Sequence, residues 1–295
     1  MLKKSRPDGT YLKDLSHFTR ILPYLMPSRN GAAIYFEQDF DVTRALEYVR
    51  KHNGQDGRTG GRLSFFHLFL CAAVRTIALR PKMNRFVSGL NYYQRNQIVF
   101  NFVAKKQLTD EGGEINITIP FAPDETMETV SAKVTAQVSR GKGEEGNEGD
   151  DINALLMKFP RWVVRLVIWS IRFLDYHNML PGSFIRSTPF WCTIFFTNVG
   201  SVGIDAPFHH NFEMGTCGFF IALGKIRKER VVAEDGTVQE RHRVKVTFTY
   251  DDRIADGIYC GKAIDLFRGF VENPDQLATP LEITPALRSE LMLKE

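Results

Sequence analysis

The sequence predicts a mixed α/β protein, because segments with the patterns of strands and helices alternate along the chain. Apolar residues make up 43% of its 295 residues, which is enough to bury a sizeable core. The last third of the chain consists of strand-like segments that lead into a closing helix. No internal repeat occurs, which argues against a solenoid or a propeller.

The elements of the first half follow from residue spacing. The segment 32–40 alternates in the manner of a strand, and 42–52 has helical spacing. A strongly apolar helix is expected from Ser64, its N-cap, to about Leu79, where Pro81 stops it. The other elements expected in this half are strands at 91–93, 97–105 and 115–120 and a helix at 127–139.

The second half begins with a stretch of glycines and acidic residues. Residues 141–151 have no apolar side chain to bury, which predicts a mobile surface loop. A helix is expected over 152–176. The elements expected after it are strands at 190–197, 217–224 and 244–250, a hairpin turn at 234–237, and a helix at 257–271 that Pro274 ends.

Charge and cysteine usage limit the classes of function. Lys plus Arg exceed Asp plus Glu by only 38 − 34 = 4, and the excess is scattered, so we expect no nucleic-acid partner. The four cysteines form no CxxC pair, and we expect neither a metal site nor a disulfide framework. No apolar segment follows the basic N-terminus, so we expect no signal peptide and a cytoplasmic protein.

The most distinctive local feature is the charged turn, residues 250–257, which joins a strand to the closing helix. Asp251, Asp252, Arg253 and Asp256 lie within six residues. Functional sites are often built on such turns. An alternative interpretation is an N-cap with an Arg–Asp pair that only fixes the turn.

Several motifs give this chain a resemblance to a known family. The run Asp251 to Gly257, followed by Glu272-Asn273-Pro274, resembles the D-H-R-x-x-D-G and E-[ND]-P motifs of 2-oxoacid dehydrogenase acyltransferases. The run Phe195 to Gly203 is similar to T-I-S-N-L-G-x-x-G of the same family, and 219–224 resembles its A-I-L-A-V-G run. Weaker matches at 41–43 and 81–84 extend the resemblance to most of Phe18 to Leu277.

This resemblance implies the chloramphenicol acetyltransferase-like fold, with residues 1–295 forming a single acyltransferase-like domain. It implies acyl transfer between coenzyme A, or an acyl-coenzyme A, and an acceptor thiol, hydroxyl or amine. In the family a histidine is the general base and a Ser or Thr hydroxyl steadies the oxyanion, and such sites form between subunits of a trimer. By position, Thr197 would be the oxyanion donor and Asp256 would form the structural salt bridge, with Arg20 as its candidate partner. The neighbouring motif residues Asn198, Arg253 and Gly257 would shape the site.

The chain departs from the family where Asp252 occupies the position of the histidine. An ordinary aspartate has a pKa of about 3.9 and is a weak base toward a thiol or a hydroxyl. The neighbours Asp251 and Asp256 would raise the pKa of Asp252, and Arg253 would lower it. Three possibilities stay open: a carboxylate base, a base located elsewhere, or a homologue that binds or scaffolds without catalysis.

Several histidines and cysteines are further candidates for catalytic groups. His209 and His210 offer an imidazole base in the loop after the Thr197 motif, although a structural role for them is the simpler interpretation. Cys217 and Cys260 are weak candidates for a nucleophile, because no adjacent motif would lower their thiol pKa. His67, His177 and His242 have no supporting neighbours.

An unusual helical insert lies at 159–174. Arg161, Arg165 and Arg172 share one helical face, while Trp162, Leu166, Trp169 and Phe173 form another. It carries too many charges to span a bilayer. A buried helix at a subunit interface is one interpretation; peripheral contact with a membrane or lipid, or the wall of an acyl channel, is the other.

The acyltransferase-like region begins almost at the N-terminus, so we expect no lipoyl domain and an acyl thioester donor from outside. The resemblance also implies that the protein associates with itself as a homotrimer or a larger oligomer. The two functions kept open are an acyltransferase with an atypical base and a catalytically inactive homologue that serves as an oligomeric scaffold or binds an acyl ligand.

Overall fold

A six-stranded mixed sheet forms the centre of the molecule, with strand order β2-β9-β8-β7-β5-β6. The computed structural model describes residues 5–54, 62–105, 113–143, 156–233 and 235–294. β7 runs parallel to both β5 and β8, and the other neighbouring strands are antiparallel. The strands are β2 (Ala33–Asp41), β5 (Ile98–Lys105), β6 (Glu114–Phe121), β7 (Ile194–Asn198), β8 (Phe219–Val232) and β9 (Val238–Asp251).

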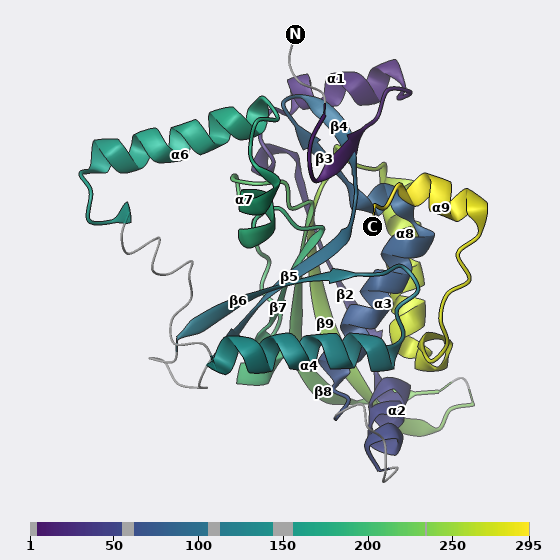
Figure 1. Cartoon of the computed structure of the whole chain (residues 1–295). Coiled ribbons are helices and arrows are strands. Elements are labelled where there is room, and N and C mark those ends of the chain that lie inside the picture. Colours follow the sequence, from purple (N-terminus) through teal and green to yellow (C-terminus); the bar gives the residue numbers. More distant parts are fainter. Residues whose placement is uncertain (1–4, 55–61, 106–112, 144–155, 234, 295) are drawn as a thin grey trace.

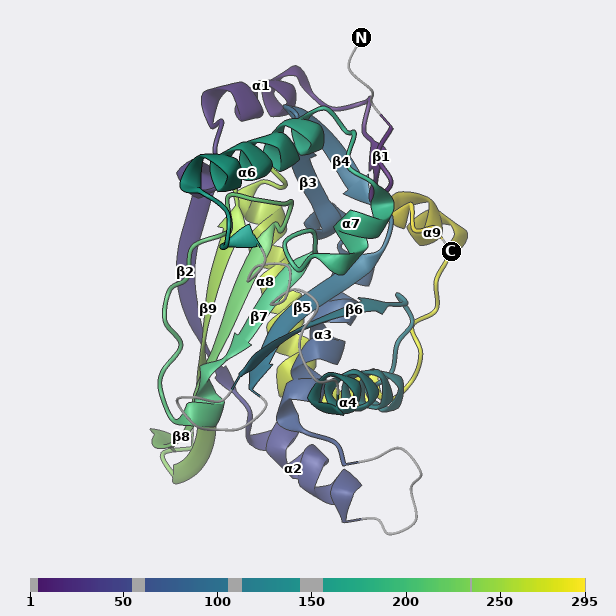
Figure 2. The same cartoon turned by 60° about the vertical axis from the view of Figure 1, so that its left-hand side comes forward.

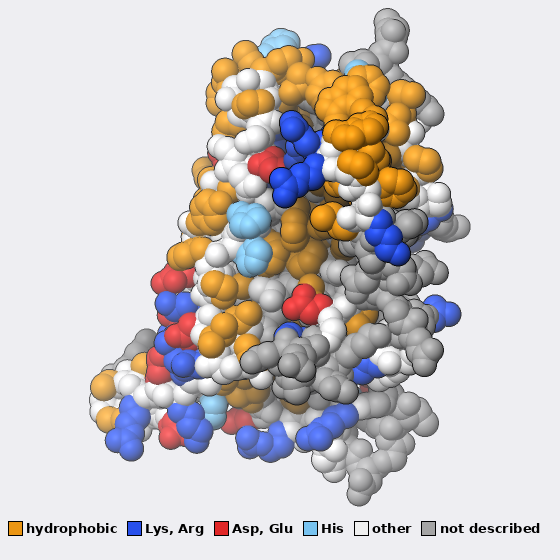
Figure 3. Space-filling view, turned by 90° about the vertical axis from the view of Figure 1, so that its left-hand side faces the viewer, with side chains coloured by type: hydrophobic (Ala, Val, Ile, Leu, Met, Phe, Trp, Pro, Cys, Tyr) orange, Lys and Arg blue, Asp and Glu red, His pale blue; other side chains and the backbone are white. Residues whose placement is uncertain are grey.

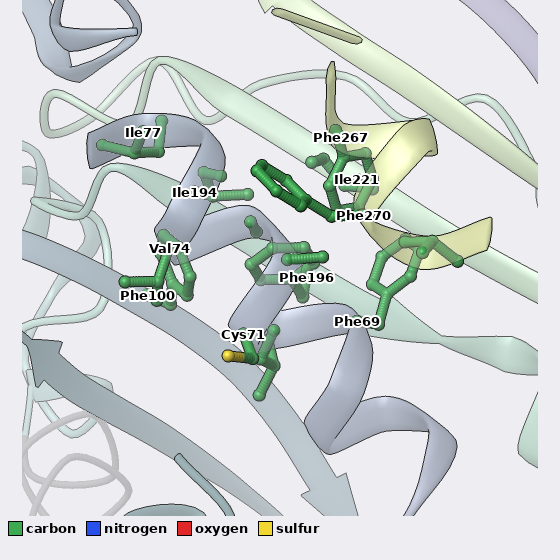
Figure 4. Close-up of a cluster of buried hydrophobic side chains, with 14 of the residues drawn as sticks. Phe69, Cys71, Val74, Ile77, Phe100, Ile194, Phe196, Ile221, Phe267 and Phe270 are labelled. Atoms are coloured by element: carbon green, nitrogen blue, oxygen red, sulfur yellow. The ribbon is translucent and has the colours of Figure 1, made fainter. Parts of the chain in front are cut away.

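One face of this sheet is covered by helices (Figures 1 and 2). These helices are α2 (Thr43–Asn53), α3 (Phe65–Leu79), α4 (Met127–Gly143) and α8 (Gly257–Glu272). Aromatic side chains join the layers: the ring centroids of Phe69 on α3 and Phe267 on α8 are 4.8 Å apart, and Phe69 also lies 6.1 Å from Phe196 on β7. Figure 4 shows these rings among aliphatic side chains of the same core.

The start of α3 confirms the cap expected from the sequence. The Ser64 hydroxyl accepts a hydrogen bond from the His67 backbone N–H at 3.2 Å, and the His67 ring accepts one from the Ser64 N–H at 3.3 Å. Together they form a capping box. After α3 ends at Leu79, Pro81 opens a short 3-10 helix rather than continuing the α-helix.

The opposite face of the sheet carries a segment without regular structure, residues 204–216, which we call the strap. The Thr247 hydroxyl donates to the Pro207 carbonyl at 2.6 Å, and the Thr249 hydroxyl donates to the His209 carbonyl. Because both threonines project from β9 toward the strap, we call this side of the sheet the strap face. α6 (Arg161–Tyr176) and α7 (Gly182–Ser187) lie on the same side (Figure 2).

A smaller antiparallel sheet, in the order β1-β4-β3, stands at one end of the large sheet (Figure 1). Its strands are β1 (Gly9–Tyr11), β3 (Arg85–Ser88) and β4 (Asn91–Arg95). The helices α1 (His17–Leu25) and α9 (Pro285–Leu291) lie at this same end. Among the described helices, none combines the length and apolar composition needed to cross a membrane.

Several boundaries expected from the sequence are wrong. The helix expected over 152–176 begins at Arg161, because Pro160 lies at its N-cap with extended ψ, and 152–155 lie outside the described residues. Residues 141–143 end α4 instead of opening a loop, and 144–151 also lie outside the described part. The strand expected from 190 starts at Ile194, because the Phe190 carbonyl accepts backbone hydrogen bonds from the end of the strap.

The hairpin and the closing helix expected in the C-terminal part are confirmed, but β8 and β9 extend well beyond the strands expected at 217–224 and 244–250. β8 and β9 form the predicted hairpin, with Val232 opposite Val238, and the Asp235 carboxylate accepts a hydrogen bond from the Thr237 backbone N–H in its turn at 2.9 Å. The closing helix is α8, and it ends one residue before Asn273.

The aromatic core makes a stability prediction. Phe267→Ala removes a ring that is 4% exposed and packs on Phe40, Phe69 and Phe248, so we expect a loss of about 3–5 kcal/mol in the free energy of unfolding. Chemical denaturation measures it. Ile258→Ala, on the same helix but 75% exposed, is the control and should change stability by less than about 0.5 kcal/mol.

Candidate functional site

The charged turn is held by a buried ion pair. The Arg253 guanidinium donates from Nε to Asp251 Oδ1 and from Nη2 to Oδ2, each at 2.7 Å, and the two residues are 4% and 2% exposed. A third bond runs from Arg253 Nη1 to the Met26 carbonyl at 2.9 Å, which ties the turn to the segment after α1. Burial alone would lower the pKa of Arg253, but the bonds to Asp251 outweigh burial and raise it. The side chains of Asp251 and Arg253 therefore serve to stabilise the fold of the turn.

The side chain of Asp256 also has a structural role. Its carboxylate caps α8 by accepting a hydrogen bond from the Tyr259 backbone N–H at 2.9 Å, and this bond lowers the pKa of Asp256. The expected salt bridge between Asp256 and Arg20 does not form among the described residues, because the carboxylate is turned to the first turn of its own helix. Arg20 instead lines a cavity beneath α1. Gly257 follows the cap, and no atom lies within 4 Å of the position of an added Cβ, so no steric demand for glycine exists there.

Asp252 is the acid of this turn that the fold leaves free. Its backbone N–H donates to the Ala32 carbonyl at 2.9 Å, but within the described part of the chain its carboxylate accepts no hydrogen bond. The side chain is half-buried. Partial burial and the neighbouring Asp251 charge raise its pKa. With a raised pKa and no hydrogen-bond donor among the described residues, this carboxylate is available to accept a proton.

The Thr-Asn segment occupies the end of β7. Thr197 lies two residues after Phe195, which packs with the strap residue Phe212, so its side chain is on the strap face. Its hydroxyl has no hydrogen-bond partner among the described residues. Asn198 ends the strand, and its carbonyl accepts the Ser201 hydroxyl at 2.8 Å. Glycine is required at 200, since a Cβ there would lie 2.2 Å from the Gly224 carbonyl oxygen of β8.

The two expected bases in the strap are close to this segment. The His209 ring stacks on the Phe220 ring of β8 with 3.8 Å between centroids, and Phe220 is paired with Phe195 of β7. His209 thus lies on the same sheet face as Thr197, one strand away. His210 is exposed, and its Nδ1 lies 3.1 Å from the Asn211 carbonyl oxygen. The strap face around these residues is hollowed and lined by hydrophobic and histidine side chains (Figure 3).

Asp252 and Thr197 do not meet within one chain. Thr197 is paired with Ala222, and Ala222 is paired with Thr247 of β9, four positions before Asp251. At about 3.3 Å per residue, the two segments are roughly 15 Å apart along the sheet, in addition to the two strand spacings between them.

The cysteines do not resemble nucleophiles. Cys71, Cys192, Cys217 and Cys260 are all buried. Burial raises the pKa of Cys260 to about 12. Burial alone would also raise the pKa of Cys217, but a hydrogen bond from Cys192 and the charge of Arg29 lower it; at 1% exposure it has no access to a substrate. In the described ranges no group of three His, Cys, Asp or Glu side chains could hold a metal.

The sequence analysis missed Arg29, which positions the strap. Its guanidinium donates to the carbonyls of Phe212 and Gly215, and it is 8% exposed. Beside it, Arg253 and Arg172 of α6 line a cavity of about 220 Å³ between the charged turn and α6. Neither motif nor spacing near residue 29 indicates this role.

Comparison with known proteins supports the expected fold. Residues 192–279 match the family model of the 2-oxoacid dehydrogenases acyltransferase (catalytic domain). The dihydrolipoamide acetyltransferase of Azotobacter vinelandii covers 90% of this chain and 93% of its own, with a TM-score of 0.59 and 11% identity. The cubic core of the pyruvate dehydrogenase multienzyme complex covers 90% of this chain and 93% of its own, with a TM-score of 0.57 and 10% identity. Chloramphenicol acetyltransferase covers 91% of this chain and 99% of its own, with a TM-score of 0.53 and 12% identity. No curated protein matches by sequence.

The expected resemblance is therefore confirmed. The family model supports it over 192–279, which contains both the Thr-Asn segment and the charged turn. The likeness of fold extends over nearly the whole chain, and the chain has the α/β fold of chloramphenicol acetyltransferase and of the acyltransferase cores.

The buried ion pair makes a second prediction. Arg253→Met leaves the Asp251 carboxylate buried without its cation, and we expect a loss of about 3–5 kcal/mol in unfolding free energy. Urea denaturation measures the loss. The double variant Asp251→Asn/Arg253→Met should recover part of it, while Arg268→Met, which breaks only an exposed pair, should cost at most about 1 kcal/mol. If Arg253→Met and Arg268→Met lost the same unfolding free energy, the Asp251–Arg253 pair would not have this stabilising role.

The raised pKa of Asp252 predicts a pH-dependent stability. The folded state prefers the protonated carboxyl, so the charged form costs stability above the folded-state pKa. Asp252→Asn removes this cost and should stabilise the protein at pH 7, by less than about 1 kcal/mol because much of the carboxylate faces water. The gain should shrink on acidification and vanish below the unfolded-state pKa. Thermal unfolding across pH measures it. Asp256→Ala, which loses a cap, should instead be less stable at pH 7.

Proposed function

We propose that this protein is an acyltransferase that moves an acyl group from a coenzyme A-type thioester to an acceptor thiol, hydroxyl or amine, in the cytoplasm. The observation that carries the proposal is the hydroxyl of Thr197, which has no hydrogen-bond partner among the described residues and belongs to the strap face, within the segment that matches the acyltransferase family model. A serine, a histidine and an asparagine have been studied for their part in the mechanism of the Azotobacter enzyme. Thr197 takes the position of the family's hydroxyl in the motif resemblance.

The chemistry requires a base and an oxyanion donor. Asp252 accepts the proton of the acceptor as the acceptor attacks the thioester carbonyl. The Thr197 hydroxyl donates a hydrogen bond to the oxyanion of the tetrahedral intermediate. When the C–S bond breaks, the coenzyme A thiolate takes the proton back from Asp252, so that protons balance. The raised pKa of Asp252 brings the carboxylate closer to the basicity that this step requires.

The separation within one chain favours a site between two copies. Roughly 15 Å along the sheet divide Asp252 from Thr197, so the charged turn of one copy would face the Thr-Asn segment of another. The related dehydrogenase core is a cubic assembly, which supports self-association of this fold. We propose a homotrimer or a larger oligomer.

The strap offers a different base. His209 is one strand from Thr197 in the same chain, and a neutral imidazole is the usual base near pH 7. Its ring is stacked on Phe220, and this stacking limits its freedom to follow a substrate. His210, exposed beside it, is the more accessible of the two.

A second function is favoured by the state of the charged turn. Asp251, Arg253 and Asp256 all hold the fold, and no imidazole replaces the missing histidine in the turn. A catalytically inactive homologue, which scaffolds an oligomer or binds an acyl ligand, would keep this architecture unchanged.

Binding separates the two functions first. We expect coenzyme A and acetyl-coenzyme A to bind when titrated calorimetrically into the folded protein. Absence of binding, with folding verified by circular dichroism, would leave only the scaffold.

Turnover then tests the residues. With acetyl-coenzyme A as donor, dihydrolipoamide as acceptor and chromatographic detection of products, Thr197→Val should reduce kcat by about 10²–10³-fold. Thr279→Val, an exposed threonine, is the matched control and should have no effect. Asp252→Asn should also abolish most of the activity if it is the base, and His210→Ala should do so if the strap supplies the base. Unchanged turnover in both variants would remove both proposed bases.

A further inference from the structure

The insert helix α6 presents apolar side chains to solvent. Trp162, Leu166, Trp169 and Phe173 are 68%, 52%, 60% and 45% exposed. They recur at intervals of three and four residues and therefore form one stripe along the helix. A surface helix normally presents polar residues to solvent, whereas α6 presents these four apolar side chains.

A second stripe, made of arginines, runs beside the first. Arg161, Arg165 and Arg172 are exposed. Their spacing puts them on one side of the aromatic stripe, and Figure 3 shows Lys and Arg side chains next to the hydrophobic cluster over α6. The acidic residue of segment 156–180 is Asp175 alone. Its carboxylate forms an ion pair with Arg6 at 2.9 Å and accepts a hydrogen bond from the Trp191 ring N–H at 3.0 Å. The exposed side of α6 is thus apolar and cationic together.

The helix is attached to the body at its C-terminal end, where Ile171 and Leu174 pack against the cluster of Leu180, Ile185 and Trp191. Val163, Val164, Val167, Ile168, Ile171 and Leu174 are half-buried and lie on the side opposite the aromatic stripe. The Asp175–Arg6 pair anchors its C-terminal end. The N-terminal half extends away from the sheet (Figure 1).

A second helix at the same end of the molecule repeats the exposure. α1 lies near α6 in both Figure 1 and Figure 2, and its Phe18, Tyr24 and Leu25 are 72%, 65% and 65% exposed. Its Ser16 cap, which accepts the Thr19 N–H at 3.1 Å, fixes where this helix starts. Two helices thus expose aromatic and aliphatic side chains at one end of the protein.

We propose that α6, with α1 beside it, docks this protein onto the surface of a membrane that contains anionic lipid. Tryptophan and phenylalanine enter the interface between headgroups and acyl chains, and Arg161 and Arg165 reach the lipid phosphates. Charge complementarity selects a lipid surface over a second copy of this chain, because the described exposed face of α6 offers no carboxylate to pair with the arginines of another α6. None of the described helices is able to cross a bilayer, so the contact is peripheral. This inference does not depend on the proposed acyl transfer.

Vesicle binding tests the proposal with the full chain. We expect the protein to float with vesicles of equimolar phosphatidylcholine and phosphatidylglycerol and to remain unbound with phosphatidylcholine alone. The protein has three tryptophans, of which Trp191 is 3% exposed, so a blue shift of emission on vesicle addition reports Trp162 and Trp169. Brominated acyl chains should quench this emission.

Two pairs of variants separate the apolar and the ionic contributions. Trp162→Ser/Trp169→Ser should weaken binding by about tenfold or more, while Val232→Ser/Val238→Ser, equally exposed at the distant hairpin, should not. Arg165→Gln should weaken binding by about fivefold, and Arg230→Gln, which removes the same charge from the hairpin, should not.

Three results would overturn the proposal. The first is a folded protein that binds neither kind of vesicle. The second is equal binding to neutral and anionic vesicles, with Arg165→Gln indistinguishable from Arg230→Gln. The third is a change of oligomeric state in Trp162→Ser/Trp169→Ser, seen by sedimentation velocity, without any vesicle binding; this would make the face an interface between copies of the chain.

Discussion

β7 runs parallel to β8, and β9 returns antiparallel on the far side of β8. The segments that follow β7 and β9 therefore leave the sheet at opposite ends, and no side-chain rotation brings Thr197 to Asp252. Strand register is costly to change, since a slip of one residue would exchange the faces of Phe196, which packs beneath the helices, and Phe195, which packs beneath the strap. The fold thus fixes what one chain can do alone. For the acyl transfer proposed above, either a second copy would complete the site or the strap histidines would serve Thr197 within the chain.

The acidic residues of the charged turn differ in whether the fold uses their carboxylates. The Asp251–Arg253 pair is buried, and Asp256 caps α8, so each is satisfied without a ligand. Asp252 alone has a carboxylate that accepts no hydrogen bond among the described residues. Losing an architectural member would leave a buried charge or an uncapped helix, whereas a change at 252 disturbs neither. The architecture of the turn therefore does not depend on which side chain stands at position 252.

Local patterns predicted the parts of the fold that local chemistry determines. The Ser64 cap starts α3, and Pro81, which lacks a backbone N–H, prevents the helix from continuing. The turn residues predict the β8–β9 hairpin. The short elements β1, β3, α7 and α9 were not predicted, because they depend on contacts between distant segments rather than on periodicity. The same holds for Arg29: its bonds to strap carbonyls join residues almost two hundred positions apart. Motifs located both halves of the candidate site, but only the register revealed their separation.

The insert helix connects these features. Arg172 projects from α6 and lines the same cavity of about 220 Å³ as Arg253 of the charged turn. Asp175, the penultimate residue of α6, forms an ion pair with Arg6 and a hydrogen bond with Trp191, which hold the end of α6 beside that cavity. A surface that engages the aromatic stripe would therefore lie over the end of the sheet where Asp252 stands. A membrane in this place would present apolar chains near the charged turn, and a site between copies would have to remain open beside it. If both proposals hold, the position of α6 would constrain the orientation of the protein on the membrane and the direction from which a substrate reaches Asp252.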